Sequence, residues 1–562
     1  MAPVNRAKKR PKGGETTSAP DCRRSRRRRS NTWCRSGGHQ VAACATEVCR
    51  FIGVSISPFR VAPPVTVLAL IVLLSGCVGQ ASSQHGHVVK NAAQHVVLTI
   101  EPKRPGREFV LGAVGLSIEA RELATDDLSA SHRSLVALMR LLGPAVLRVG
   151  GNSLDYSWWT SDGEPPPEWA TSTVTPADLA RLRGLLTATG WRVVLGVDLG
   201  HFDPTRAANE AQVAERILGS RLLGFEIGNE PSGYVSASIG LRPDSYTVSN
   251  YLEELATYSA AMQTAVPRIH LYGPDLALQT SQAWLLPIAS DKSASFTAFD
   301  LHYYPTNYSF SKGACKGTPT PTALELLSPE VREREDIALQ TMIEAGKLAH
   351  REVRISETND TSSCDVPGGP ATSPVFASAL WSLDWVLRAT SAGVAGLNFH
   401  GYLGLCRPEG FTPICAPDHA AEASGQVIAR PEYYGLLAAR QLEGGRFVPT
   451  RLNSPGPLPN LTTWATVTPR GTVRIAIDNL ATEGLAQRVS IPISGYAATY
   501  ETLVGPSVEA TTGVALGDRN VTGTRQWRPR RVRLSSMGHS FRVVVHPASA
   551  VIITLHPERS RG

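Results

Sequence analysis

The stretch Leu-Leu-Gly-Phe-Glu-Ile-Gly-Asn-Glu-Pro at residues 222–231 decides the fold, because a short apolar run ends there in a polar turn. Seven comparable β-rich runs occupy residues 109–118, 145–150, 192–199, 269–273, 298–303, 352–356 and 394–400. Helical patterns lie between them, as at residues 179–188, 251–265 and 336–350. Eight such alternations predict an α/β fold, a (β/α)8 TIM barrel. The competing architecture is an open doubly wound sheet, but no GxGxxG or P-loop motif follows any run.

Short strand-like segments separated by Gly, Pro, Asn and Ser replace the helical patterns after about residue 440. This sequence pattern is typical of an antiparallel β-sandwich. The strand-like residues 96–101 before the barrel are expected to add a strand to that sandwich. The segments cover residues 462–467, 472–477, 487–491, 498–503, 541–545 and 550–555. We therefore expect a basic disordered leader (1–60), a signal segment (61–77), a linker with the joining strand (78–106), a catalytic barrel (107–437) and a C-terminal sandwich (438–562).

Charge is concentrated in the leader. Residues 1–77 hold 14 Lys and Arg against 3 Asp and Glu, whereas the rest of the chain carries 42 basic and 45 acidic side chains. The net charge of +8 therefore belongs to the leader, and it gives no reason to expect a nucleic-acid partner.

The apolar run at residues 65–74 is too short for a membrane span, which needs about 20 residues, but it fits a signal-peptide core. It ends in Leu-Ser-Gly-Cys at 74–77, which resembles a bacterial lipobox. We expect lipid attachment at Cys77 and export to the outer face of the bacterial cell membrane, with membrane contact only through the lipid. Plain secretion is the alternative.

Four cysteines remain beyond the leader, namely Cys315, Cys364, Cys406 and Cys415. Four thiols in an oxidising compartment predict two disulfides. Three pairings are open, and we favour Cys315–Cys364 and Cys406–Cys415, because the second closes a short loop and the first would tie neighbouring barrel loops. No cysteine or histidine cluster has the spacing of metal ligands, so neither a metal nor a cofactor is expected.

Two glutamates follow the fourth and seventh runs, Glu230 and Glu357. TIM-barrel active sites gather at the C-terminal ends of the strands. Retaining cleavage of a glycosidic bond needs two carboxyl groups about 5–5.5 Å apart, one to protonate the leaving oxygen and one to attack the anomeric carbon. A single Glu after a strand is usually a solvated or ion-paired residue. The two positions together carry the prediction.

Residues 223–231 with Arg-Ile-Ser-Glu-Thr-Asn at 354–359 resemble the retaining glycosidases that carry the acid/base on strand 4 and the nucleophile on strand 7. More narrowly, the chain resembles glycoside hydrolase family 79, the heparanase and β-glucuronidase family. The resemblance implies that Glu230 is the general acid/base and Glu357 the nucleophile. It also implies that the −1 subsite is lined by Asn229, Glu119, Asn152, Tyr303 and Tyr304.

Other residues near these strand ends have more than one interpretation. Arg148 and Glu226 are expected to form a buried ion pair inside the barrel, and His302 to orient a neighbouring carboxylate. Trp158 and Trp159 either stack on sugar rings or cover an edge of the barrel. If the sixth strand continues through residues 303–304, only one of the two tyrosines there can face the sugar.

The substrate class follows less directly from the sequence. The loop at residues 358–369 contains hydroxyls and glycines but no Lys, Arg or Tyr, so backbone amides would have to bind a uronate there. Outside the leader acidic residues outnumber basic ones, which gives no support for endo-action on a polyanion. We therefore expect a uronic-acid-containing glycan as partner and exo-action on terminal β-D-glucuronides. The alternatives are a neutral-sugar or heparanase-like endo-specificity, or a surface protein that binds carbohydrate without cleaving it.

Overall fold

The computed structural model describes residues 94–558, except 237–238, 294, 308–309, 312–313, 316–320, 363–371, 408–410 and 524–525. His87–Gly562 form one compact unit. The expected leader, the signal segment and Cys77 lie outside the described residues. Among the helices that the structure describes, none is both long and apolar enough to cross a membrane.

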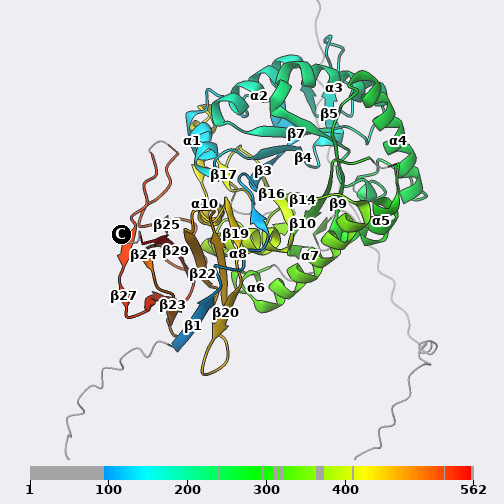
Figure 1. Ribbon diagram of the computed structural model, residues 1–562. Helices are drawn as coiled ribbons and strands as arrows, with labels where there is room; N and C mark the ends of the chain where they lie inside the picture. Colours follow the sequence, from blue (N-terminus) through cyan, green and yellow to red (C-terminus); the bar gives the residue numbers. More distant parts are fainter. Residues whose placement is uncertain are drawn as a thin grey trace, which may run out of the picture. The chain divides into compact units, whose positions relative to one another are not determined.

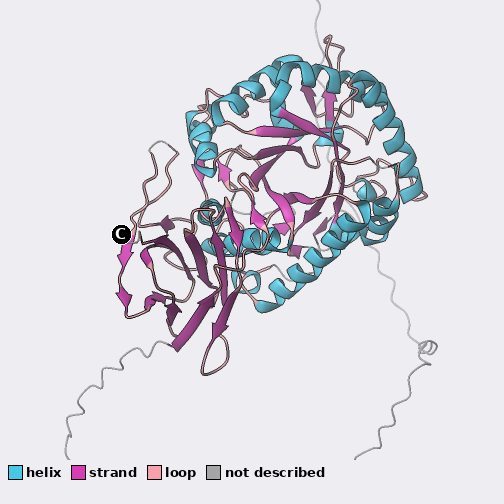
Figure 2. Ribbon diagram, viewed as in Figure 1, coloured by secondary structure: helices cyan, strands magenta, loops and turns pink. Residues whose placement is uncertain are grey.

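Eight parallel strands close into a barrel (Figures 1 and 2). In chain order they are β3 (Val114–Glu119), β4 (Val146–Gly150), β7 (Arg192–Val197), β8 (Leu222–Ile227), β9 (Leu271–Ala277), β10 (Ala298–Tyr303), β14 (Val353–Thr358) and β16 (Val394–Gly401). The last strand pairs with the first, with Leu397 opposite Val114. The predicted (β/α)8 barrel is therefore confirmed, and β8 and β14 are its fourth and seventh strands.

Helices surround this barrel, as Figure 2 shows. α2 begins at a capping box formed by Thr175 and Asp178 and ends at Gly190, whose φ of 83° suits glycine. The helical segments predicted from the sequence overlap α2, α4 and α7 and are confirmed. The helices are α1 (Arg133–Leu142), α2 (Pro176–Thr189), α3 (Pro204–Leu218), α4 (Val248–Ala265), α5 (Leu278–Ser290), α6 (Ala323–Leu326), α7 (Pro329–Ala349), α8 (Phe376–Ala392), α9 (His419–Ala423) and α10 (Pro431–Arg440).

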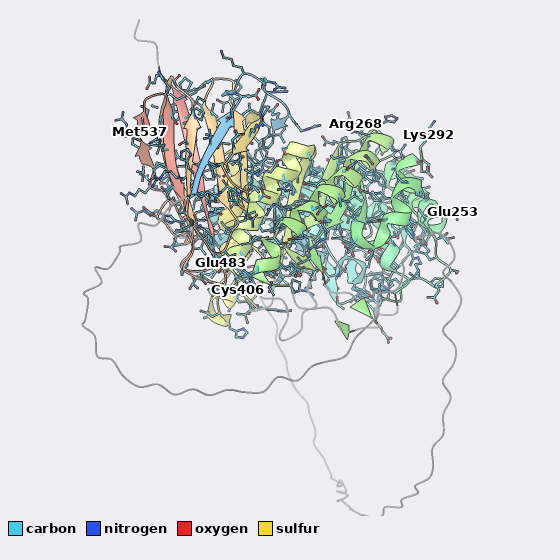
Figure 3. The ribbon with its side chains drawn as sticks, turned by 90° about the horizontal axis from the view of Figure 1, so that it is seen from below. Glu253, Arg268, Lys292, Cys406, Glu483 and Met537 are labelled. Carbon is cyan, nitrogen blue, oxygen red and sulfur yellow. A yellow bond between two sulfur atoms is a disulfide. The ribbon has the colours of Figure 1, made fainter. Side chains whose placement is uncertain are left out.

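Two sheets make up the region beyond the barrel. One has the order β20 (Thr450–Asn453), β1 (Gln94–Ile100), β23 (Gln487–Pro492), β28 (Ser540–Val545) and β27 (Ser536–Met537). The other runs β2 (Glu108–Phe109), β19 (Gly445–Phe447), β21 (Leu461–Val467), β22 (Val473–Asn479), β29 (Ser549–Pro557), β24 (Tyr496–Val504) and β25 (Ala515–Leu516), with β26 (Val532–Leu534) paired to β24. Figure 3 labels Met537 on this sandwich and Glu253 on the outer helices of the barrel.

The core of the sandwich is formed by buried aliphatic side chains from both sheets, such as Leu98, Val489, Ile475 and Ile553. The sequence placed its strands within a few residues. The pairing is antiparallel except for β1 and β23, which run parallel. The segment before the barrel therefore contributes a central strand to the first sheet.

Two strand boundaries differ from the prediction. The run at residues 109–118 is not one strand, because β2 pairs with β19 of the sandwich and a turn through Gly112, at φ 82°, separates it from β3. The fifth strand was placed at residues 269–273, but β9 continues to Ala277. The sequence Gly-Pro-Asp at 273–275 resembles a turn, yet these residues are buried within β9. Gly273 and Pro274 pair with β10, and Asp275, at φ 59°, lies where the register shifts before pairing resumes at Leu276.

Four short two-stranded sheets lie in the loops. They are β5 (Ser157–Trp159) with β6 (Ser172–Val174), β11 (Thr306–Asn307) with β15 (Thr361–Ser362), β12 (Phe310–Ser311) with β13 (Ala314–Cys315), and β17 (Ile414–Cys415) with β18 (Ile428–Ala429). Cys406, labelled in Figure 3, forms a disulfide with Cys415. Cys364 lies outside the described residues, so the pairing Cys315–Cys364 stays a prediction.

Candidate active site

Two glutamates meet at the C-terminal end of the barrel. Glu357 lies on β14, whereas Glu230 follows β8 in a left-handed backbone conformation at φ 48°. The Glu230 amide donates to the carbonyl of Asp275 at 3.0 Å, which fixes that turn against β9. One carboxylate oxygen of each glutamate and one ring nitrogen of His302 lie within 4.8 Å of one another.

The carboxylate of Glu357 is buried and held from several sides. Arg148 Nη1 donates to its Oε2 at 2.7 Å, and the Tyr304 hydroxyl donates to its Oε1 at 2.7 Å. His400 Nδ1 lies 3.6 Å from Oε2. Burial raises the pKa of Glu357, but the charges of His400, His302 and Arg148 outweigh it and lower the pKa to about 2. Glu357 is therefore ionised at neutral pH.

Arg148 on β4 lies at the centre of the barrel and contacts three carboxylates. Its Nε donates to Glu226 Oε2 at 2.7 Å, and its Nη2 donates to Asp275. Its Nη2 also donates to Asn229 Oδ1 at 2.9 Å. The expected buried ion pair with Glu226 is confirmed. The same guanidinium also holds Glu357, so it connects the barrel interior with the candidate nucleophile.

His302 bridges two acidic groups at the end of β10. Its Nε2 lies 2.8 Å from Asp275 Oδ1, and its Nδ1 lies 2.9 Å from Glu230 Oε1. Burial lowers the pKa of His302, but the charges of Asp275 and Glu357 raise it well above its usual value. The expected role, orienting a neighbouring carboxylate, agrees with these contacts, and that carboxylate is Glu230.

The residues expected around the sugar lie on one side of this pair. Glu119, at the end of β3, accepts from the Ser153 amide at 2.8 Å, and His400 Nε2 lies 3.5 Å from its Oε1. Asn229 Nδ2 donates to Asn152 Oδ1 at 3.2 Å, which joins the loops after the second and fourth strands. Burial raises the pKa of Glu119, but His400 and Ser153 together lower it below its usual value.

The two neighbouring tyrosines point to different surroundings. Tyr304 bonds to Glu357, whereas the Tyr303 ring packs against Trp385 with ring centres 5.3 Å apart. Since β10 ends at Tyr303, alternation along the strand turns the two side chains apart. The structure therefore brings Tyr304 but not Tyr303 to the carboxylates, which corrects the prediction that both line the subsite.

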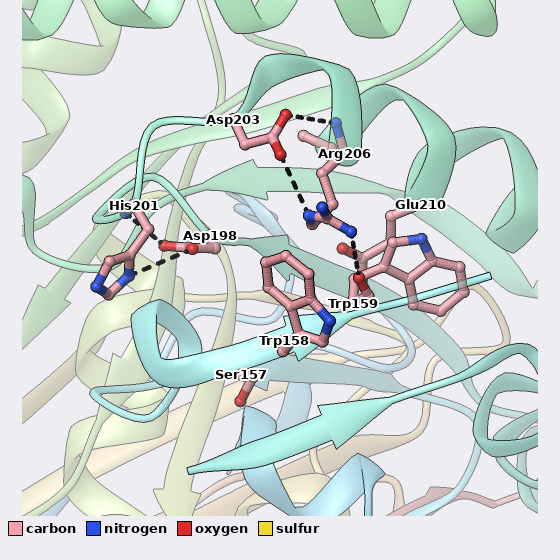
Figure 4. A pocket seen from close by; sticks show the side chains of 9 residues that line it. Ser157, Trp158, Trp159, Asp198, His201, Asp203, Arg206 and Glu210 are labelled. Carbon is pink, nitrogen blue, oxygen red and sulfur yellow. Dashed lines mark hydrogen bonds and ion pairs between the residues drawn. The ribbon is translucent and has the colours of Figure 1, made fainter. Parts of the chain in front are cut away.

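A separate small pocket of about 20 Å³ lies beside β5 (Figure 4), and neither Glu230 nor Glu357 is among its lining residues. Trp158 and Trp159 line it, with Asp198 and Glu210 among the others. The Trp158 ring is covered by Arg206, whose guanidinium carbon is 3.5 Å from the ring centre. Trp159 is buried and donates to Asn209 at 2.8 Å. Of the two interpretations of these tryptophans, the contacts favour covering the barrel edge.

Glu230, His302 and Glu357 could in principle offer ligands to a metal ion, because their nearest atoms are within 4.8 Å of one another. The atoms concerned already have partners, since Tyr304 and Arg148 bind Glu357 and Asp275 binds His302. A cation here would also lie beside the buried guanidinium of Arg148. The donor set therefore fits acid/base chemistry better than metal binding.

Two residues of this cluster were not assigned from the sequence. Asp275 was missed because Gly-Pro-Asp resembles a turn, although it lies on β9, accepts from Ser356 at 2.7 Å and contacts His302 and Arg148. His400 was marked as the end of the eighth strand but given no role, although it approaches Glu119 and Glu357. A search of every strand end for titratable side chains would have found His400.

No model of a known protein family matches the sequence. A β-glucuronidase of Aspergillus niger is 24% identical over 423 residues, which cover 67% of this chain and 73% of that protein.

Solved structures resemble the chain over most of its length. A 4-O-α-L-rhamnosyl-β-D-glucuronidase of Fusarium oxysporum 12S has a TM-score of 0.63 and 16% identity, with coverage of 81% of this chain and 100% of that chain. An α-L-arabinofuranosidase of Thermotoga maritima has a TM-score of 0.58 and 16% identity, with coverage of 82% and 99%. The chain is glycoside hydrolase-like, with a TIM barrel followed by a β-sheet domain.

Proposed function

We propose that the chain is a retaining β-glycosidase in which Glu230 is the general acid/base and Glu357 the nucleophile. The observation that carries this proposal is the approach of their carboxylate oxygens to within 4.8 Å. A retaining pair is about 5–5.5 Å apart, whereas an inverting pair is about 6.5–9.5 Å apart to admit a water molecule. The approach of these two glutamates is thus closer than an inverting pair needs, which supports retention.

In the first step, an oxygen of Glu357 forms a bond to the anomeric carbon while the bond from that carbon to the leaving oxygen breaks. Glu230 gives its proton to the leaving oxygen, so the aglycone departs as an alcohol. In the second step, Glu230 takes a proton from a water molecule, whose oxygen bonds to the anomeric carbon and releases Glu357. Each glutamate returns to its starting state, and the product keeps the β-configuration.

The surroundings of the pair suit these separate roles. Arg148 and Tyr304 hold Glu357 ionised and fix both of its oxygens. Glu230 is more open, with 29% of its side chain exposed, and has His302 on one oxygen. Within the part of the chain that the structure describes, no side chain holds its other oxygen, which can therefore reach the leaving group.

We further propose terminal β-D-glucuronides as the substrate. The support is the likeness to the Aspergillus niger β-glucuronidase and the resemblance of the site motifs to family 79. On this proposal Asn152, Asn229, Glu119 and Tyr304 surround the sugar next to the scissile bond, and their support is their contacts with one another and with the two glutamates' neighbours. Export through the signal segment, with Cys77 as lipid attachment site, belongs to the same proposal, and the disulfide Cys406–Cys415 suits an oxidising compartment.

The test is hydrolysis of an aryl β-D-glucuronide beside the β-glucoside, β-xyloside and β-galactoside, with the anomer of the first product followed by proton NMR. Glu357→Ala and Glu230→Gln should abolish turnover, whereas Glu333→Gln, on the exposed face of α7, should not change it. Azide should restore turnover of the Glu357→Ala variant and give the α-glycosyl azide.

Each other outcome has a defined meaning. Release of the α-anomer first would refute retention. Turnover of a neutral glycoside alone would keep the mechanism and reject the uronate. Binding of the glycosides without turnover would favour the carbohydrate-binding alternative.

A further inference from the structure

A cleft of about 640 Å³ lies at the seam between the barrel and the sandwich, and its walls are unusually basic. Arg440 comes from the end of α10, Arg474 from β22 and His556 from β29. Arg470 lies in the turn between β21 and β22, and Arg531 lies just before β26. Outside the leader the chain is slightly acidic, with 42 basic against 45 acidic side chains. The four arginines therefore make this cleft positively charged, although the region as a whole is slightly acidic.

The arginines of the cleft have few anionic partners. Arg440, Arg470 and Arg474 have no carboxylate oxygen within 4.0 Å among the residues that the structure describes. Arg474 Nη1 donates to the carbonyl of Glu443 at 2.6 Å. Arg531 Nε lies 3.9 Å from Glu501 Oε2, at the outer limit of an ion pair. The cleft thus holds positive charge that the protein itself does not balance.

One donor of the cleft, Nε of Arg440, is buried without a hydrogen-bond partner among the residues that the structure describes. A buried unpaired donor typically costs about 1–3 kcal/mol, so proteins rarely keep one unless something else binds it. The charge of Arg531, added to burial, lowers the pKa of Arg474, so these cations repel one another in the free protein. An anion in the cleft would relieve both costs.

One acidic side chain lines the cleft, and it weakens the charge only in part. Glu443 Oε2 accepts from the Gly112 amide at 3.3 Å, and burial raises the pKa of this carboxyl to about 7. At neutral pH Glu443 is therefore only partly ionised. The balance in the cleft stays strongly positive.

We propose that this seam cleft binds the anionic groups of an acidic polysaccharide. Guanidinium forks bind carboxylates through paired hydrogen bonds, and the hydroxyls of Thr468, Thr472 and Thr554 in the same cleft suit the hydroxyls of a sugar. Single-stranded nucleic acids are held by stacking on aromatic side chains, and no aromatic ring other than the imidazole of His556 is among the lining residues that the structure describes. A uronate-rich glycan therefore fits the walls better than a nucleic acid does.

The cleft is remote from the glutamates, because Leu111, which lines it, precedes the first barrel strand, whereas the glutamates lie at the C-terminal end of the barrel. A polymer bound here would tether the enzyme to its substrate without holding the bond that is cleaved. The site therefore goes beyond the proposed catalytic function and can fail independently of it.

The experiment uses the full chain and measures the accessibility of each arginine of the cleft. Phenylglyoxal labels accessible arginines, and mass spectrometry reports the labelling of each one with and without oligogalacturonate. Labelling of Arg470 and Arg531 should fall at least five-fold. Labelling of Arg488 and Arg542, which are exposed on β23 and β28 of the other sheet, should not change. Because each arginine is read separately, binding of the oligomer to the basic leader does not obscure the result.

A pair of matched variants gives a second readout. Arg470→Gln/Arg531→Gln should weaken oligogalacturonate binding to the cleft at least ten-fold, whereas Arg488→Gln/Arg542→Gln should leave it unchanged. Hydrolysis of the aryl glucuronide should stay within two-fold of wild type in both. A sulfated oligosaccharide that protects better than the uronate would identify sulfate as the preferred anion.

Three outcomes would overturn the proposal. They are unchanged labelling of Arg470 and Arg531, equal protection by a neutral galactan, and equal protection by single-stranded DNA.

Discussion

Replacing Tyr304 with Phe removes one hydrogen bond to the candidate nucleophile and leaves the rest of the ring in place. The Tyr304 hydroxyl donates to Glu357 Oε1 at 2.7 Å, and Arg148 remains on the other oxygen. A hydrogen bond to a charged group contributes about 1.5–3 kcal/mol. If between half and all of that energy serves to place and ionise Glu357 during catalysis, kcat/KM should fall by about 4–150-fold.

The same change should move the acid limb of the pH profile. Donation by Tyr304 is one of the causes that lower the pKa of Glu357, so its loss raises that pKa. Glu357 must be ionised to attack, and activity is lost as the pH falls through its pKa. The limb of Tyr304→Phe should therefore lie about 1–2 pH units above that of the wild type.

The assay is kcat/KM on an aryl glucuronide between pH 2 and pH 7, a range that begins at the wild-type pKa of about 2 and contains the raised limb of the variant. Tyr303→Phe is the matched control, because that ring packs against Trp385 and not against the glutamates. It should stay within about two-fold of wild type, a change worth less than about 0.5 kcal/mol. Equal losses in the two variants, or a Tyr304→Phe acid limb that does not move, would refute the argument.

Further predictions concern charge and stability. Asp275→Asn should lower kcat/KM at least about ten-fold by removing a charge that Arg148 and His302 need. Glu226→Gln keeps an oxygen that can accept from Arg148 Nε and removes a carboxyl whose pKa burial raises, so it should cost less, and equal losses would contradict this order. The pKa of Glu335 is raised to about 8 by burial, so its contribution to stability is present at low pH and lost as the pH rises towards 8. In urea unfolding, the free energy of unfolding of Glu335→Gln relative to the wild type should therefore rise between pH 5 and pH 8, by at most about 5 kcal/mol. A difference between variant and wild type that stays the same across this pH range would contradict the burial argument. Cys406→Ser/Cys415→Ser should lower the free energy of unfolding by about 2–3 kcal/mol in non-reducing urea and by nothing in dithiothreitol, and equal losses in both would assign the effect to the substitutions.

The sequence was sufficient for the barrel because its strands are buried on both faces. Such strands give short apolar runs whose boundaries fall at polar turns, and β7 and β10 are examples that the sequence located to within two residues. The fold then determines which strand ends meet, so Glu230 and Glu357 could be paired without knowing any distance.

The sequence did not predict the contacts that position Glu230 and Glu357 and lower the pKa of Glu357. Asp275 lies in a Gly-Pro-Asp sequence that would end a strand in most settings. Pairing of β9 with β10 resumes after a bulge at this left-handed residue, which the local sequence does not indicate. Whether Tyr303 or Tyr304 faces the site depends on the residue at which β10 ends, and strand ends are uncertain by a few residues from sequence alone. Both cases depend on tertiary pairing rather than on local pattern.

The network around Arg148 and His302 also bears on how charge moves during the proposed reaction. Arg148 contacts Glu226, Asp275 and Glu357, and His302 contacts Asp275 and Glu230. In the proposed first step Glu357 becomes an ester and loses its negative charge, while Glu230 gives up its proton and gains one. The negative charge therefore moves from the glutamate that Arg148 contacts to the glutamate that His302 contacts, at 2.9 Å from the Glu230 carboxylate. Because a cationic or hydrogen-bonding side chain stands beside each glutamate, the network can stabilise the ionised form of Glu357 in the free enzyme and of Glu230 in the glycosyl-enzyme.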